Sequence, residues 1–236
     1  MTSIIIPLNN RSTVRNLELR YCLRSIEKHL TGVGDIFIVG YCPDWVQNVI
    51  YIPFDEDPRN RFRDRNIMNK MLAACKDERV SENFLMVHDD HFLLSDYEAG
   101  KFPYYHCGHM VPGEGQYGQT KRNTEHLLCP LPGIPILNYD AHCPILFNKE
   151  KFLKITHADW SKWYGYCLKT LYCVMNGIGG EYMDDIKIRM PLQADEIMQA
   201  IAGRSWFSIG DRCFVDHGMK ELLQTLYPNP SKYETN

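Results

Sequence analysis

The sequence has no long apolar run and no excess of basic residues, and each absence excludes a class of protein. The apolar start at residues 4–6 meets Pro7 at once, which is too short for the core of a signal peptide and far too short for a membrane span. Lys and Arg number 26 against 29 Asp and Glu, for a net charge of -3, so binding to a nucleic-acid backbone would need a local basic patch. We therefore expect a soluble chain with no signal peptide.

The cysteines also lack a pattern. Nine of them, an odd number, are scattered singly from Cys22 to Cys213 with no C-x-x-C pair. This spacing favours reduced thiols over a disulfide framework or a four-thiolate zinc site, and hence a cytoplasmic location. What is present is an ordinary globular composition, 44% hydrophobic and 23% charged, in a chain of 236 residues that can bury one large core.

Short apolar runs alternate with amphipathic stripes over the first ninety residues. Apolar runs predict strands, and apolar residues at three- and four-residue steps predict helices. The strands are expected at residues 4–6, 36–39, 49–52 and 84–87, and the helices over 19–30 and 62–75. This alternation is typical of a mostly parallel α/β sheet flanked by helices, in which ligands bind at the carboxyl ends of strands.

The second half is less regular. Residues 101–135 are rich in Gly, Pro, Tyr and His and show no sustained period, which predicts a long irregular loop, of the kind that often covers a ligand site. A strand is expected at 145–147, helices at 163–175, 193–202 and 219–226, and a frayed tail at 228–236. We predict a single domain over 1–236, with a nucleotide-binding half at 1–95 and an acceptor-side half at 96–227.

The acidic turn His88-Asp89-Asp90-His91 directly follows a predicted buried strand. Two adjacent carboxylates at a sheet edge repel each other, and a divalent Mg²⁺ or Mn²⁺ ion would relieve this while bridging the phosphates of a nucleotide diphosphate. In a structural alternative, the aspartates cap the following turn and the histidines satisfy local backbone groups. The two histidines would form only half of a zinc site.

Several segments of the first ninety-five residues carry a resemblance to a known family. They are residues 16–29, residues 36–39, Pro43-Asp44-Trp45 and residues 84–94. Together and in this order they resemble the core of the Stealth family of sugar-phosphate transferases, which is similar in turn to GT-A glycosyltransferases. GT-A enzymes carry a metal-binding D-x-D-type motif after an equivalent strand, and His88-Asp89-Asp90 stands in that place. The opening at residues 6–11 lacks the acidic V-D-G-type motif of Stealth proteins and looks more like an ordinary GT-A enzyme.

A second resemblance lies in residues 176–186, which are similar to the G-G-E-D-type segment of inverting GT-A galactosyltransferases. It implies that an acid there deprotonates the acceptor hydroxyl, with Glu181, Asp184 and Asp185 as candidates. The alternative is a helix start, because two glycines followed by acids also suit a helix N-terminus. The GT-A resemblance further implies a late metal-binding histidine, for which His217 is the candidate, with Asp90 on the metal and Asp89 nearer the ribose.

The remaining candidates bind the two substrates. Arginine suits phosphate because its planar fork donates paired hydrogen bonds, although a solvated basic helix face is the alternative for any one of them. The predicted donor-binding residues are Pro7, Asn10, Arg11, Asp55, Arg61, Arg65, Asn69 and Asp89. The predicted acceptor-binding residues are His142, Trp160 and Trp163.

These resemblances imply a metal-dependent, inverting GT-A glycosyltransferase of the hexosyltransferase class. It would use Mn²⁺ or Mg²⁺ and move a sugar from a nucleotide-sugar donor, UDP-sugar being favoured, to a glycan or other hydroxyl acceptor. Three alternatives stay open: a Stealth-like sugar-1-phosphate transferase, a phage-type glycosyltransferase acting on hydroxylated DNA bases, and a sugar- or nucleotide-binding module without turnover.

Overall fold

A five-stranded sheet, with its first strand at the centre, organises the N-terminal half. The computed structural model describes residues 1–59, 63–129, 136–210, 212–214 and 217–235. The strand order is β4-β3-β1-β5-β9, with β1 (Thr2–Leu8), β3 (Val33–Gly40), β4 (Ile50–Pro53), β5 (Asn83–Met86) and β9 (Ile145–Asn148). All neighbours pair in parallel except β9, which runs antiparallel to β5. The predicted mostly parallel α/β sheet is confirmed.

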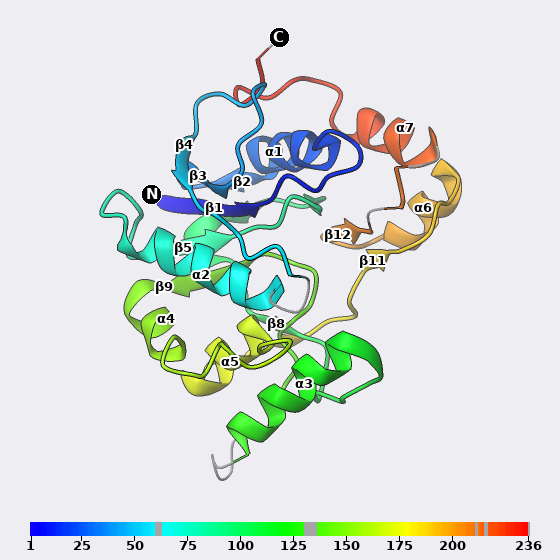
Figure 1. Cartoon of the computed structure of the whole chain (residues 1–236). Coiled ribbons are helices and arrows are strands. Elements are labelled where there is room, and N and C mark those ends of the chain that lie inside the picture. Colours follow the sequence, from blue (N-terminus) through cyan, green and yellow to red (C-terminus); the bar gives the residue numbers. More distant parts are fainter. Residues whose placement is uncertain (60–62, 130–135, 211, 215–216, 236) are drawn as a thin grey trace.

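Helices cover both faces of this sheet. The helix α1 (Leu17–His29) lies on one face, whereas α2 (Arg63–Lys76), α4 (Lys149–Ile155) and α5 (Leu168–Met175) lie on the other (Figure 1). Successive residues of a strand point to opposite faces. Accordingly, Ile4 and Ile6 belong to the core under α1, while Ile5 belongs to the core under α2 and α5.

A second, smaller sheet begins directly after the acidic turn. Its order is β11-β12-β6, with β11 (Lys187–Ile188), β12 (Trp206–Ile209) and β6 (His91–Leu93). The helices α6 (Ala194–Ile201) and α7 (His217–Leu226) pack beside it (Figure 1). Because the turn joins β5 of the large sheet to β6 of the small one, it lies where the two sheets meet.

One prediction for the middle of the chain was wrong. Within the segment expected to be an irregular loop, residues Gly115–Leu128 form the helix α3, which has 14 residues. Apart from Leu128, its buried residues are small or polar, namely Gly118, Thr120, Asn123 and Thr124, so no apolar stripe marks it. Residues 130–135 of the predicted loop lie outside the described residues.

The remaining short elements connect these layers. They are β2 (Leu30–Thr31), β7 (Tyr97–Glu98), the 3-10 helix η2 (Ala99–Lys101), β8 (Tyr105–His106) and β10 (Glu181–Tyr182). The nine cysteines are free thiols. Among the described residues, no helix combines the length and the apolar character needed to cross a bilayer.

The C-terminal segment is fixed to the N-terminal half, so the predicted frayed tail was wrong. The Glu234 side chain is only 1% exposed and forms ion pairs with Arg20 at 2.5 Å and with Arg24 at 2.8 Å. Its Oε1 also accepts hydrogen bonds from the backbone N–H and the hydroxyl of Ser231. Tyr233 is buried beside it. No periodic pattern marks this segment, because it packs without forming a helix or strand.

Candidate functional site

The acidic turn is closed by its own histidines. The backbone N–H of His88 donates to Nδ1 of His91 at 3.3 Å, and the N–H of His91 donates to the carbonyl of His88 at 3.2 Å. Burial lowers the pKa of His88 to about 3 and holds the pKa of His91 well below its ordinary value, so both imidazoles are neutral at pH 7. The structural role considered for the histidines is therefore confirmed for His91.

Asp90 is paired with a lysine. Its Oδ2 accepts from Nζ of Lys187 at 2.9 Å and from Oγ of Ser208 at 3.2 Å, and its Oδ1 lies 3.7 Å from Nε2 of His91. Burial alone would raise the pKa of Asp90, but the Lys187 ammonium reverses this and the pKa is lowered. Asp90 is thus a carboxylate at pH 7, and its charge is compensated by Lys187.

Strand register explains why these groups meet. In the small sheet, Lys187 is the register partner of Ser208, and Ser208 is the partner of His91, so the three form one row across β11, β12 and β6. Side chains in such a row stand on the same face. Asp90 precedes this row and receives hydrogen bonds from two of its members.

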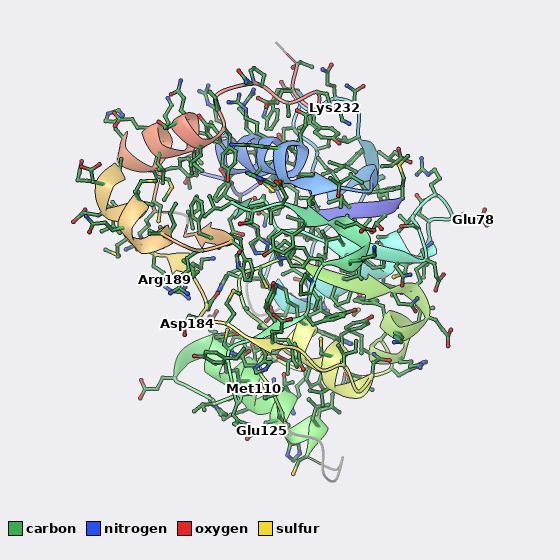
Figure 2. The ribbon with its side chains drawn as sticks, turned by 180° about the vertical axis from the view of Figure 1, so that it is seen from behind. Glu78, Met110, Glu125, Asp184, Arg189 and Lys232 are labelled. Atoms are coloured by element: carbon green, nitrogen blue, oxygen red, sulfur yellow. The ribbon has the colours of Figure 1, made fainter. Side chains whose placement is uncertain are left out.

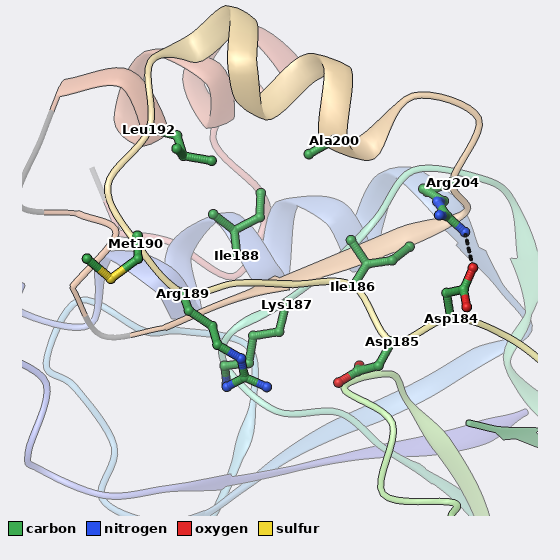
Figure 3. Close-up of a pocket in the computed structure, with 10 residues that line it drawn as sticks. All are labelled: Asp184, Asp185, Ile186, Lys187, Ile188, Arg189, Met190, Leu192, Ala200 and Arg204. Atoms are coloured by element: carbon green, nitrogen blue, oxygen red, sulfur yellow. Dashed lines mark ion pairs between the residues drawn. The ribbon is translucent and has the colours of Figure 1, made fainter. Parts of the chain in front are cut away.

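The strand around β11 also divides its side chains between two faces. Ile186 and Ile188 point toward α6, whereas Asp185, Lys187 and Arg189 point the other way (Figure 3). This two-residue alternation is the expected geometry of a strand with one apolar face. As a result, the carboxylate of Asp185 and the cations of Lys187 and Arg189 lie on the side of the strand that faces Asp90.

His142 and Asp185 form a hydrogen-bonded pair. Nδ1 of His142 lies 2.7 Å from Oδ2 of Asp185, and the backbone N–H of His142 donates to Oδ1 at 2.8 Å. Burial would raise the pKa of Asp185, but these contacts with His142 lower it. An ionised Asp185 fixes the proton of His142 on Nδ1, which leaves Nε2 as an acceptor.

The buried Lys169 supports this pair. Its ammonium donates to the carbonyls of Ala141 and Cys143 at 2.8 and 2.7 Å, that is, to the residues on both sides of His142. His142 also lies within electrostatic reach of Asp90. We use the term edge cluster for Asp90, His142, Asp185, Lys187 and Ser208.

The other two predicted catalytic acids lie outside the edge cluster's contacts. Glu181 is exposed in β10, whose partner is β8. Asp184 is turned toward Arg204, 3.7 Å away, and accepts a hydrogen bond from the hydroxyl of Tyr182 (Figure 3). Figure 2 shows Asp184 and Arg189 on the segment that leads from the α3 end of the molecule to the α6 end. Of the three acids, only Asp185 is joined to His142.

A second polar group lies at the carboxyl ends of β1 and β4, and we call it the Lys70 group: Lys70, Glu56 and Arg11. The ammonium of Lys70, whose side chain is 2% exposed, donates to the carbonyl of Leu8 and to Oε1 of Glu56. Arg11 lies 3.6 Å from the other oxygen of Glu56. Burial lowers the pKa of Lys70, and the charges of Glu56 and Asp89 oppose this, so Asp89 lies within electrostatic reach of this group.

Backbone shape makes room for Lys70. Gly40, at the end of β3, has φ +115, and a Cβ there would lie 2.3 Å from the carbonyl oxygen of Leu8 and 2.7 Å from Cε of Lys70. A side chain at this position would therefore collide with both.

The remaining predicted donor residues are spread around this edge. Pro7 is buried inside β1, and Asn10 and Asp55 are exposed just after β1 and β4. Arg65 donates to Asp57 at 2.8 Å. The structure places Asn69, partly exposed, on α2, and Arg61 lies outside the described residues. Their roles stay predictions.

The two predicted acceptor tryptophans differ. Trp160 is 5% exposed, packs edge-on against Tyr166 and donates its indole N–H to the carbonyl of Ile155, which leaves no ring face for a sugar. Its predicted role is corrected to core packing. Trp163 is 60% exposed and keeps its predicted role as a hypothesis.

The residues around Asp90 do not fit a resident divalent cation. One carboxylate oxygen already accepts from an ammonium, which repels a metal ion, and the predicted ligand His217 is exposed at the start of α7 and is not among the described residues that contact Asp90. In the part of the chain that the structure describes, no three His, Cys, Asp or Glu side chains come together as a metal site. The requirement for Mn²⁺ or Mg²⁺ stays a prediction from the sequence.

An open pocket of about 430 Å³ lies behind β11. Its apolar wall consists of Ile186, Ile188, Leu192 and Ala200, beneath α6, and Lys187 and Arg189 contribute from the other side of the strand (Figure 3). The pocket shares Asp185 and Lys187 with the edge cluster.

Sequence reasoning missed Lys187, Ser208 and Lys70. The alternation of polar and apolar residues from Asp185 to Arg189 would have indicated a strand with Lys187 beside Asp185 on its polar face. No comparable signal marks Ser208 or the buried Lys70, because their roles depend on contacts with distant segments.

Comparisons with known proteins do not identify a family for this chain. No protein-family model matches the chain, and no curated protein matches it. Among solved structures, one similar chain is described as the crystal structure of a glycosyltransferase involved in the glycosylation of the major capsid of PBCV-1. The likeness covers 97% of this chain and 99% of that one, with a TM-score of 0.43 and 12% sequence identity, and it carries no inference about activity.

Proposed function

We propose that the chain is a GT-A-type glycosyltransferase that moves a hexosyl group from a nucleotide-sugar, with UDP-sugar favoured, to a hydroxyl acceptor with inversion. The observation that carries the proposal is the His142–Asp185 pair beside the acidic turn. The pair is held by hydrogen bonds of 2.7 and 2.8 Å and lies within electrostatic reach of Asp90. A base next to a donor site is what direct displacement at a sugar carbon requires.

In the proposed reaction, His142 is the general base. The acceptor oxygen bonds to the anomeric carbon while the bond from that carbon to the diphosphate oxygen breaks, and its electron pair leaves with the diphosphate. The acceptor proton passes to Nε2 of His142. Asp185 holds the imidazole in the required tautomer through Nδ1 and stabilises the imidazolium that forms. This moves the role of base from the carboxylates to His142, and Asp185 becomes its partner.

The donor is proposed to lie across the carboxyl ends of β1, β4 and β5. Asp89 would accept hydrogen bonds from the ribose, and Arg11 would donate to phosphate, for which its exposed guanidinium is suited. The position follows the rule that open parallel sheets bind ligands at this edge. No step is routed through a metal ion, since the donor set at Asp90 does not fit one.

The test begins with the purified chain and a panel of nucleotide-sugars, with released nucleotide and transferred sugar as readouts. A tight donor should raise the melting temperature by mass action. Release of a nucleoside diphosphate supports the proposal, whereas release of a monophosphate would replace it with sugar-1-phosphate transfer. Duplex DNA containing hydroxylated bases is included among the acceptors.

Variants then test the base. His142→Gln and Asp185→Asn should each lower kcat by roughly 10²- to 10⁴-fold, the usual contribution of general-base catalysis, with a much smaller change in donor affinity. His157→Gln is the matched control, because His157 is exposed on the surface. Full activity of both site variants would rule out the proposed base.

A further inference from the structure

The Asp90–Lys187 ion pair occupies the place where the sequence motif predicts a metal ion. Both partners are largely buried, with side-chain exposures of 24% for Asp90 and 14% for Lys187. The hydroxyl of Ser208 donates a hydrogen bond to Oδ2 of Asp90, the same oxygen that accepts from the ammonium of Lys187. Two short strands and the turn therefore hold one ammonium group, paired with a carboxylate, at a defined point of the sheet edge.

A second cation lies beside it. Arg189 stands two residues after Lys187 on the same side of the strand (Figure 3). Arg189 is exposed, and among the described residues no carboxylate lies within ion-pair distance of it. An ammonium and a guanidinium on one strand face suit a ligand with two adjacent phosphate groups.

The departing group in the proposed reaction is such a ligand. A nucleoside diphosphate gains negative charge as the sugar–oxygen bond breaks, and a fixed positive charge stabilises it more than it stabilises the less negative diphosphate of the intact donor. In many enzymes that act on nucleotide phosphates, a divalent cation supplies this positive charge. At this site the ammonium of Lys187, which the Asp90–Ser208 contacts already orient, and the guanidinium of Arg189 can take this role without a rearrangement of the site.

We propose that Lys187, oriented by Asp90 and Ser208, donates hydrogen bonds to the diphosphate of the donor and that Arg189 supplies the compensating positive charge, in place of a divalent cation. Diphosphate binding by this chain is then independent of metal. The inference rests on the proposed function and adds to it the way in which the leaving group is stabilised. In this arrangement Asp90 orients the lysine instead of binding a metal ion.

The experiment measures binding of UDP and GDP to the full chain by calorimetry, with excess EDTA and again with manganese. Uridine and guanosine, which lack phosphate, are the ligand controls. We expect equal diphosphate affinity in EDTA and in manganese. Lys187→Met should weaken diphosphate binding about 10- to 100-fold, the range for loss of a hydrogen bond to a charged group, and leave the affinity for the nucleosides unchanged. Lys220→Met, on the exposed side of α7, is the matched control.

Folding is controlled separately, because Lys187→Met leaves Asp90 without its cation. The double variant Lys187→Met with Asp90→Asn removes both charges and should fold while binding diphosphate as weakly as the single variant. Diphosphate binding that requires manganese, or that survives in the double variant, would overturn the inference and leave the proposed function standing. If neither diphosphate binds under any condition, the proposed function fails and the inference fails with it.

Discussion

Replacing Glu234 by glutamine tests how much the C-terminal segment stabilises the N-terminal half. Burial alone would raise the pKa of Glu234, but hydrogen bonds from Arg24, Ser231 and Arg20 lower it from 4.5 to about 2. At about 1.4 kcal/mol per pKa unit, the ionised carboxylate contributes roughly 3 kcal/mol to the free energy of unfolding at neutral pH. Loss of one partner from a buried ion pair costs about 3–5 kcal/mol, which agrees.

The predicted change is large enough to measure by thermal unfolding. For a chain of 236 residues the unfolding entropy is about 0.5 kcal/mol/K, so Glu234→Gln should lower the melting temperature by about 6 °C at pH 7. Because the folded-state pKa is depressed, the stabilisation is present above about pH 4.5 and is lost as the pH falls toward 2. The difference between wild type and variant should therefore shrink in acid.

The matched control is Glu78→Gln, since Glu78 is exposed at the periphery of the molecule (Figure 2). Its melting temperature should stay within about 1 °C of wild type. If Glu234→Gln behaves like this control, or if its effect does not depend on pH between 2 and 5, the ion pairs contribute nothing to stability and the reasoning is refuted.

Two further predictions concern stability. Burial and the charge of Asp140 raise the pKa of Asp64 to about 7, so the folded chain keeps a proton that the unfolded chain loses above about pH 4. Stability should fall as the pH rises from about 4 to 7, and Asp64→Asn should flatten this part of a melting-temperature profile; an unchanged slope would contradict it. Gly40→Ala should cost at least about 2 kcal/mol in urea unfolding because of its φ of +115 and the contact with Leu8, whereas Gly179→Ala, with open space around it, should be near neutral.

The sequence alone predicted those strands and helices whose apolar residues form a continuous run or recur at helical spacing. The strands β1, β3, β4 and β5 and the helices α1 and α2 were predicted because each buries a run or stripe of apolar side chains. The acidic turn was placed at a strand end for the same reason. Helix α5 begins at Leu168, later than predicted, because Tyr164 and Gly165 have positive φ and interrupt the expected helix.

Contacts between distant residues could not be predicted. Lys187 is separated from Asp90 by 97 positions, and β11, which carries it, is only two residues long. The helix α3 buries threonine and asparagine, so its sequence has no apolar period. Of the edge cluster, the predictions from the sequence therefore included Asp90, His142 and Asp185, but not Lys187 and Ser208, which pair with the carboxylate of Asp90.

The attachment of Glu234 to α1 has a consequence for the order of events during protein synthesis. Arg20 and Glu234 are 214 positions apart, so at about 5–20 residues per second the ribosome adds Glu234 some 10–40 s after Arg20. During that interval α1 carries two arginines whose partner has not yet been translated. The first strands and helices of the nascent chain can assemble early, but their final stabilisation is delayed until residue 234 has emerged.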